Sequence, residues 1–183
     1  ERAYRSGLAE VVKSACVGDR PLFETLEASV EAVLSRELAV VEELALRAIA
    51  VKAAIVSRDE RESGERALLN FGHTLGHALE AEGGFTRLTH GEAVSLGMVA
   101  MLRVGVSLAE TDPAEAARVI DLLGRLGLPV TLDPTMLRAA LPFLALDKKR
   151  RSGSIRAVLL TRIGEARLHP LALDAFPSLL DPG

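Results

Sequence analysis

The sequence of 183 residues contains one cysteine, Cys16, no tryptophan, one tyrosine and five phenylalanines. A single cysteine cannot form an internal disulfide bond, and it is typical of a protein in the reducing cytoplasm, so we expect that location and a core role for Cys16. Aromatic residues make up 3% and the net charge is −3. A chain of this composition offers little to nucleic-acid bases or phosphates. Because no apolar run reaches about 18 residues, we expect no membrane span.

The sequence also lacks two kinds of motif. Neither a G-x-G-x-x-G segment nor a P-loop is present, so we expect no nucleotide-phosphate cradle in this chain. The first residues, ERAYRSGLAE, contain neither an initiator methionine nor the apolar core of a signal peptide. They resemble the approach to a helix, and we interpret the chain as a piece of a longer protein.

Hydrophobic residues recur at helical spacing through the first half of the chain. Leu8, Val11, Val12 and Ala15 follow the i, i+3, i+4, i+7 pattern of an amphipathic helix. The next hydrophobic stretch, 21–56, is too long for one average helix, and we expect it to bend or break near 29–36. A third helix is predicted over 62–82, with Ser63 as its N-cap and Gly83–Gly84 as its stop.

Capping signals predict the later helices. Thr89 and Glu92 have the spacing of a capping box, which places His90 in a first helical turn. Asp112-Pro113 and Asp133-Pro134 each predict a helix start, and Pro142 is expected to end the second of these helices. Only 154–161 and 165–171 are typical of strands. We therefore predict one mainly α, bundle-like domain over 1–183, with one small β-hairpin near its C-terminus.

Three of the four histidines lie between His73 and His90. His73 and His77 are four residues apart and share a helix face, a spacing that can chelate zinc, although Thr74 stands where H-E-x-x-H proteins have glutamate. The flanking glycines, Gly72 and Gly76, suggest close approach by a backbone or a ligand. A pair of hydrogen-bonded core histidines explains the same pattern equally well.

A polar stripe would run along the helix predicted over 62–82. Its members are spaced by three or four residues, and the face that they form is too polar for a core, so we interpret it as the wall of a site. Taken alone, Glu10 is read as a solvated carboxylate, and Lys13, three residues further on, offers it a surface ion pair as an alternative. The members of the stripe are Glu62, Arg66, Asn70, His73 and His77.

Four segments together resemble a known family. They are RSGLAEVVKSACVGDRPLFETLE, RDERESGERALLNFGHTLGHALE, THGEAVSLGMVAM and DKKRRSGSIRAVLLTRIG. In this order, from about Arg5 to Gly164, they are similar to the C-terminal half of the 3-dehydroquinate synthase family, a branch of the sugar-phosphate cyclases. The resemblance implies a C-terminal helical domain that binds metal and substrate. It also implies an N-terminal Rossmann-like domain that binds NAD and is absent from this chain, with catalysis in the cleft between the two.

The resemblance assigns roles to individual residues. It implies that Glu10, His73 and His90 bind Zn²⁺ or Co²⁺ with a coordination position left open. It assigns His77 to the phosphate side of the substrate, with a part in proton transfer, and Glu62 to the position of a proton acceptor. Residues that bind cofactor would lie mostly in the missing domain. The implied contacts to substrate carboxylate or phosphate are Lys13, Lys52, Arg66, Asn70 and one of Lys148 and Lys149.

The implied reaction converts 3-deoxy-D-arabino-heptulosonate 7-phosphate to 3-dehydroquinate in the shikimate pathway, which leads to chorismate and the aromatic amino acids. NAD⁺ takes a hydride, phosphate is eliminated, the hydride returns, and an aldol step closes the ring, so the enzyme is a phosphate-eliminating carbon–oxygen lyase. The implied partners are the sugar phosphate, the NAD-binding domain and a second copy in a homodimer, with no nucleic acid or membrane. The chain alone is expected to be inactive.

Two alternatives remain. The first is another cyclase of the same superfamily, such as a 2-deoxy-scyllo-inosose synthase. The set of Lys52, Arg66, Asn70 and His77 favours the dehydroquinate enzyme over this rival. The second alternative is a non-catalytic helical interaction module with structural histidines, which predicts no stoichiometric zinc.

Overall fold

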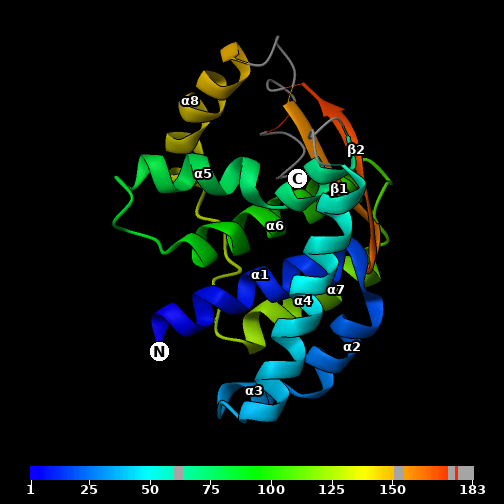
Figure 1. The fold of residues 1–183 in the computed structure, drawn as a ribbon. Helices are drawn as coiled ribbons and strands as arrows, with labels where there is room; N and C mark the ends of the chain where they lie inside the picture. Colours follow the sequence, from blue (N-terminus) through cyan, green and yellow to red (C-terminus); the bar gives the residue numbers. More distant parts are fainter. Residues whose placement is uncertain (60–63, 151–154, 173–175, 177–183) are drawn as a thin grey trace.

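A computed structural model describes residues 1–59, 64–150, 155–172 and 176, without the side chains of 145–150. Helices dominate, and one antiparallel hairpin lies near the C-terminus (Figure 1), which confirms the predicted fold class. No helix of these residues is long and apolar enough to span a bilayer. The elements are α1 (Arg2–Gly18), α2 (Arg20–Ala28), α3 (Val30–Leu34), α4 (Leu38–Arg58), the 3-10 helix η1 (Glu65–Asn70), α5 (His73–Glu82), α6 (His90–Ser107), α7 (Pro113–Arg125), α8 (Pro134–Arg150), β1 (Ile155–Arg162) and β2 (Glu165–Leu171).

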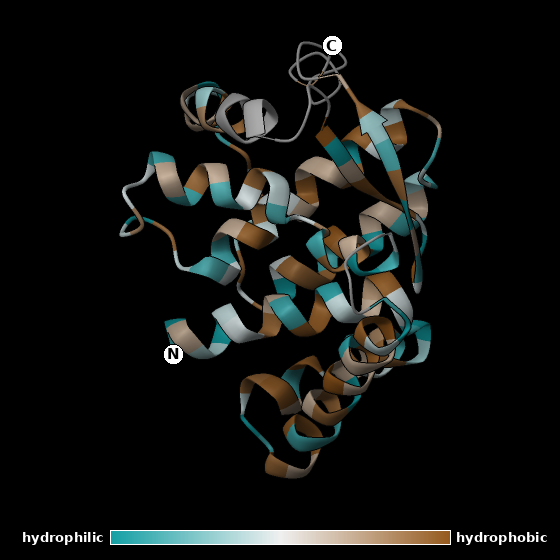
Figure 2. Cartoon of the chain, turned by 45° about the horizontal axis from the view of Figure 1, so that its top comes forward, coloured by the Kyte–Doolittle hydropathy of each residue, from teal (hydrophilic) through white to brown (hydrophobic). Residues whose placement is uncertain are grey.

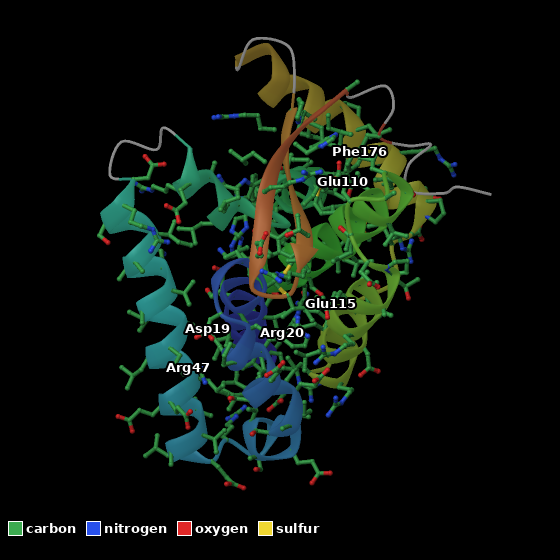
Figure 3. The ribbon with its side chains drawn as sticks, turned by 90° about the vertical axis from the view of Figure 1, so that its right-hand side faces the viewer. Asp19, Arg20, Arg47, Glu110, Glu115 and Phe176 are labelled. Atoms are coloured by element: carbon green, nitrogen blue, oxygen red, sulfur yellow. The ribbon has the colours of Figure 1, made fainter. Side chains whose placement is uncertain are left out.

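The long hydrophobic stretch breaks where the sequence predicts. It forms α2, α3 and α4, with Arg36 in the left-handed region (φ 62°) between the last two. Asp19 caps α2 by accepting a hydrogen bond from the backbone N–H of Leu22 at 2.9 Å. The same carboxylate accepts from Arg47 of α4, also at 2.9 Å (Figure 3). This pair fixes α4 against the junction of α1 and α2.

Helix α6 is the centre of the structure. It lies between α5 and α1 (Figure 1), and almost every residue from Gly91 to Gly105 is buried. Hydrophobic colours cover much of its length in Figure 2, as expected for a helix enclosed on most sides. A Cβ added at Gly97 would lie 1.8 Å from the carbonyl oxygen of Gly72, and one at Gly91 would lie 2.0 Å from that of Ser6. Both glycines therefore allow α6 to touch a neighbouring backbone directly.

The continuous helix predicted over 62–82 is wrong. The chain forms η1, turns at Phe71 and Gly72, and starts α5 at His73. The reason is tertiary: Gly72 has a φ of 78°, and a Cβ there would lie 2.7 Å from the carbonyl oxygen of Val94 in α6. The five-residue polar stripe is therefore not one helix face. Glu62 and Ser63 lie outside the described residues.

The capping predictions hold at the starts of α6 and α7, whereas the prediction for Pro142 is wrong. Thr89 and Glu92 form the predicted capping box at the start of α6, and the side chain of Asp112 caps α7. Pro142 was expected to end its helix, but α8 continues through it to Arg150. A proline inside a helix removes one backbone hydrogen bond and adds strain, and here the helix on both sides tolerates that cost.

The hairpin forms where the sequence predicts, and hydrogen bonds from its turn connect it to α7 and α1. Hydrophobic and hydrophilic residues alternate along β2 (Figure 2), while β1 is mostly buried. The backbone N–H of Ile163 donates to Glu115 at 2.7 Å, and that of Gly164 donates to the carbonyl of Cys16 at 2.9 Å. Arg20 completes the junction with an ion pair to Glu115 at 3.1 Å (Figure 3). Cys16 is fully buried, which confirms its core role, and this burial raises the pKa of its thiol.

The contact between Gly97 and Gly72 predicts a strong substitution effect. We expect Gly97→Ala to lower the free energy of unfolding by about 3 kcal/mol, because α5 and α6 must separate to admit a methyl group. Gly124→Ala is the matched control. It lies on the exposed side of α7, where an added Cβ meets only a side-chain atom at 3.9 Å, and it should stabilise by up to about 1 kcal/mol. Denaturant unfolding measures both, and equal effects would contradict the packing argument.

The capping box predicts an acid-dependent stability term. The hydrogen bond from Arg2 and those from Thr89 outweigh partial burial and lower the pKa of Glu92. A carboxylate with a lowered pKa stabilises the fold above its unfolded-state pKa, and this contribution is lost as pH falls through the folded-state value. We therefore expect Glu92→Gln to be less stable than the parent at neutral pH and equal to it in strong acid. A stability difference that does not change with pH would contradict this role.

Candidate functional site

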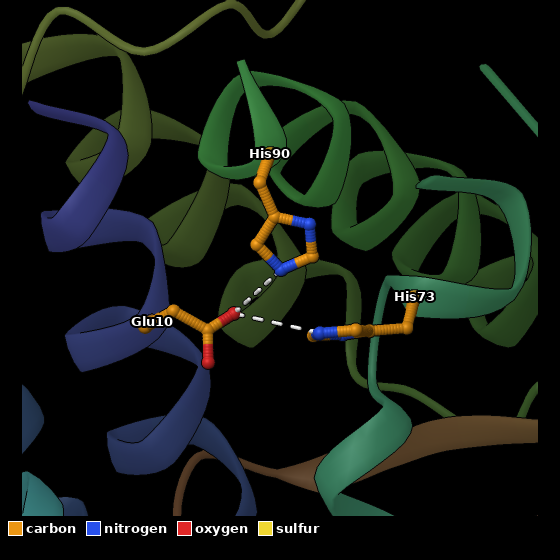
Figure 4. Close-up of side chains that lie close together, drawn as sticks. All are labelled: Glu10, His73 and His90. Atoms are coloured by element: carbon orange, nitrogen blue, oxygen red, sulfur yellow. Dashed lines mark ion pairs between the residues drawn. The ribbon is translucent and has the colours of Figure 1, made fainter. Parts of the chain in front are cut away.

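Three side chains from distant parts of the chain meet at one point. Glu10 lies in the middle of α1, while His73 and His90 are the first residues of α5 and α6. Glu10 Oε1 lies 3.5 Å from His73 Nε2 and 3.6 Å from His90 Nε2 (Figure 4). The three donor atoms all lie within 4.8 Å of one another. We call this group the Glu10–His73–His90 triad.

Hydrogen bonding orients both imidazoles of the triad. His73 Nδ1 lies 3.2 Å from the carbonyl oxygen of Phe71, and His90 Nδ1 lies 3.2 Å from Glu80 Oε1. Because a carbonyl and a carboxylate only accept, each neutral ring carries its hydrogen on Nδ1. The Nε2 lone pairs of both rings therefore face the carboxylate of Glu10.

The carboxylate of Glu10 is only half satisfied. Its Oε2 accepts a hydrogen bond from Lys13 Nζ at 2.8 Å, whereas Oε1 is buried and has no hydrogen-bond partner among the described residues. Two nitrogen lone pairs and an anionic oxygen repel one another unless a cation or a proton lies between them. One carboxylate and two imidazoles are a ligand set suited to catalytic zinc, so the residues present fit a divalent metal ion.

Lys13 corrects an expectation. The sequence offered a surface ion pair between Lys13 and Glu10, but only 6% of Lys13 is exposed. Its ammonium group is therefore buried beside Glu10 at the edge of the triad, where the lower effective dielectric strengthens the Coulomb attraction of the pair while desolvation of both charges opposes it. The sequence did not reveal this, because the helix pattern alone does not show which elements cover α1.

The protonation states suit metal binding. Burial lowers the pKa of His73 to about 4, and the nearby charge of Lys13 adds to the effect. Burial alone raises the pKa of Glu10, but the charge and hydrogen bond of Lys13 outweigh it and leave the pKa below its ordinary value. At neutral pH His73 is therefore neutral and Glu10 ionised, the forms in which both groups bind metal.

His77 lies beside the triad. Its ring centroid is 5.3 Å from that of His73 and 6.1 Å from that of His90, and the residue is exposed. Neither a zinc site made by His73 and His77 alone nor a pair of core histidines describes this arrangement. His73 converges with Glu10 and His90, and His77 is exposed beside them. Close backbone approach at Gly72 and Gly76 is confirmed: a Cβ at Gly76 would lie 3.2 Å from the carbonyl oxygen of Ala93.

The other predicted contacts are distributed over several elements. Asn70 and Arg66 are half-buried on η1, which packs against α1 and α4. Lys52 is exposed on α4, and no contact between it and the histidines is seen in the described part of the chain. Glu62 and the side chains of Lys148 and Lys149 lie outside what the structure describes.

The sequence reasoning missed two acidic residues, Glu80 beside the triad and Asp59 just after α4. Glu80 contacts His90, and its spacing from His73 and His77 on α5, seven and three residues, could have indicated a shared face. Asp59 is 7% exposed and accepts hydrogen bonds from the backbone N–H groups of Gly64 at 2.8 Å and Arg66 at 3.0 Å. No sequence signal distinguished Asp59, because its partners depend on the conformation of the segment that follows.

Comparison with known proteins gives close relatives along the sequence. Residues 7–150 match the family described as 3-dehydroquinate synthase C-terminal. The chain is 41% identical over 166 residues to a protein named 3-dehydroquinate synthase from Pelobacter propionicus, covering 90% of this chain and 46% of that protein. It is 39% identical over 170 residues to one of the same name from Thermodesulfovibrio yellowstonii, covering 92% and 47%. The chain thus spans about half the length of these relatives.

Solved structures share the fold. The 2-epi-5-epi-valiolone synthase of Streptomyces hygroscopicus, solved with NAD⁺ and Zn²⁺, superposes with a TM-score of 0.83 at 30% identity over 98% of this chain and 50% of its own. A 2-deoxy-scyllo-inosose synthase, solved with carbaglucose-6-phosphate, NAD⁺ and Co²⁺, gives 0.79 at 21% identity over 100% of this chain and 52% of its own, which shows the fold alone. By its family match and its relatives in sequence, the chain belongs to the 3-dehydroquinate synthase C-terminal family.

Proposed function

We propose that this chain is the metal- and substrate-binding domain of a 3-dehydroquinate synthase. The whole enzyme would convert 3-deoxy-D-arabino-heptulosonate 7-phosphate to 3-dehydroquinate and phosphate, with NAD held mainly by a second domain. One observation carries the proposal: the buried, unpartnered Oε1 of Glu10 faces the Nε2 atoms of His73 and His90 at 3.5 and 3.6 Å. The names of the relatives in sequence support this substrate over others.

Zn²⁺ or Co²⁺ is the proposed metal, because the related synthases are solved with these ions and NAD⁺. The ligands in this chain would be Glu10, His73 and His90. When bound, such an ion would polarise a substrate hydroxyl group and favour its alkoxide form during hydride transfer. The chemistry agrees with the donor set, which leaves room for a substrate oxygen.

The remaining residues would bind and orient the substrate. Lys13 donates one of its three N–H groups to Glu10, and the other two would serve a substrate carboxylate or phosphate. His77 is exposed beside the triad and would contact the phosphate side of the substrate and move a proton. We propose Glu62 as the proton acceptor. The further anion contacts would be Arg66, Asn70, Lys52 and one of Lys148 and Lys149.

Location and assembly complete the proposal. We infer a cytoplasmic, homodimeric enzyme of the carbon–oxygen lyase class in the shikimate pathway. The low cysteine content supports a reducing compartment, and the family resemblance supports the dimer. Sedimentation of the whole two-domain protein would test its oligomeric state.

Metal binding depends on Glu10 in this proposal. We expect the chain to bind one zinc ion, and Glu10→Gln to raise the zinc dissociation constant by more than about tenfold, or about 1.4 kcal/mol, because the neutral amide is a poor zinc ligand. Glu43→Gln on α4 is the control, since that side chain is 59% exposed and belongs to no ligand group. Competition with a chelator measures the affinities. Unchanged zinc binding in Glu10→Gln would remove Glu10 from the site.

Catalysis depends on the second domain. We expect no turnover by this chain alone, and formation of 3-dehydroquinate when it is joined to an NAD-binding domain of the family. A coupled assay for dehydroquinate measures both, with glucose 6-phosphate and sedoheptulose 7-phosphate as competing substrates. Substantial turnover by the isolated chain would contradict the proposal that a second domain supplies most of the NAD site. Cyclisation of a competing substrate instead of the heptulosonate would favour the rival synthases.

A further inference from the structure

Glu80 contacts the triad from outside it. It lies on α5, the helix that also carries His73, and its side chain is only 13% exposed. Its two carboxylate oxygens lie 3.2 and 3.3 Å from Nδ1 of His90, which begins the neighbouring helix α6. The nearly equal distances place the Nδ1–H of His90 between both oxygens. The contact therefore links two helices that each supply a ligand atom to the triad.

The position of this contact sets the direction of the His90 ring. An ionised carboxylate only accepts hydrogen bonds, so it selects the imidazole form with hydrogen on Nδ1 and a lone pair on Nε2. In the structure this Nε2 is the atom that faces Glu10 Oε1 at 3.6 Å. A carboxylate on the far ring nitrogen also makes the ligand nitrogen more basic, a pattern common around metal-binding histidines.

His90 needs such support more than His73 does. The His73 side chain is 13% exposed and its Nδ1 is held by the backbone carbonyl of Phe71. The His90 side chain is 45% exposed and follows the loop between α5 and α6. The His90 ring has those of His73 and His77 as neighbours, with centroids 5.1 and 6.1 Å away, and within the described residues Glu80 is the side chain that accepts from its Nδ1.

We propose that Glu80 is a positioning residue, which holds the His90 ring so that Nε2 points into the Glu10–His73–His90 triad. This inference rests on the metal site proposed above and deepens it. Glu80 would not touch the metal ion or the substrate. It would act through His90, by selecting one tautomer and by restricting rotation of the ring before the metal arrives.

A competing reading makes Glu80 a ligand. The donor atoms of His77, Glu80 and His90 also lie within 4.8 Å of one another. An ion held there would use Nδ1 of His90, on the opposite side of the ring from the triad. The two readings differ in stoichiometry, because the competing one adds a second ion that Glu80 binds directly.

Three variants of the 183-residue chain separate these roles. Glu80→Ala removes the acceptor, while Glu80→Gln keeps an oxygen that accepts from Nδ1–H. Glu82→Ala is the matched control, since Glu82 is also a shielded carboxylate on α5 and pairs with Arg87 of the following loop. Zinc affinity is measured by chelator competition, zinc stoichiometry by metal analysis, and the His90 tautomer by ¹⁵N NMR of the metal-free chain.

We expect Glu80→Ala to weaken zinc binding by about 10–100-fold. The His90 ring in the metal-free chain should then become a mixture of tautomers. Glu80→Gln should restore most of the affinity and the Nδ1–H form, and Glu82→Ala should match the parent in both. If Glu80→Ala fails to fold, the contrast between Glu80→Gln and the parent still decides, because a ligand role predicts loss of an ion in that variant.

Each other outcome has a definite meaning. If the parent chain binds no zinc, the proposed metal site itself is wrong. If the parent binds zinc and Glu80→Ala has the same zinc affinity and the same His90 tautomer, the metal site is retained and the positioning role is wrong. Two zinc ions in the parent and one in both Glu80 variants would assign Glu80 as a ligand and overturn the proposal. Equal losses in Glu80→Ala and Glu82→Ala would attribute the effect to the loop and overturn it as well.

Discussion

Direct backbone contact between helices is the constraint on which this structure depends. Helix α6 touches α5 where Gly97 meets the carbonyl of Gly72, and touches α1 where Gly91 meets the carbonyl of Ser6. Any side chain at these glycines would push the helices apart. Gly72 directly precedes His73, and Gly91 directly follows His90. The contacts that bring the helices together therefore also fix the backbone positions of the two histidines.

This packing explains why the site is electrostatically unbalanced. Close approach buries an anionic oxygen of Glu10 opposite two nitrogen lone pairs, and the buried Lys13 satisfies only the other oxygen. Folding must hold these groups in place against their mutual repulsion, which a bound cation would remove. The carbonyl of Phe71 contacts Nδ1 of His73, and the carboxylate of Glu80 contacts Nδ1 of His90, on the side of each ring away from Glu10.

Local signals predicted the parts of the fold that depend on neighbours in sequence. The capping box at Thr89, the break before α4 and the two strands follow from residues a few positions apart, and all were predicted. Two of the predictions that failed involve distant partners. The helix over 62–82 splits because Gly72 meets α6, and Lys13 is buried by elements that the helix pattern does not identify.

The sequence by itself determined the helical class and the hairpin near the C-terminus, because capping residues and hydrophobic periodicity depend on neighbours along the chain. Its resemblance to the family implied the candidate ligands. Only the tertiary structure shows how near Glu10, His73 and His90 lie to one another, that Lys13 is buried beside them, and that Glu80 contacts His90 from outside the triad. The physical reason is that ligand geometry depends on where helices distant in sequence cross. That crossing is set by side-chain volume at the contacts, above all by its absence at Gly72, Gly91 and Gly97.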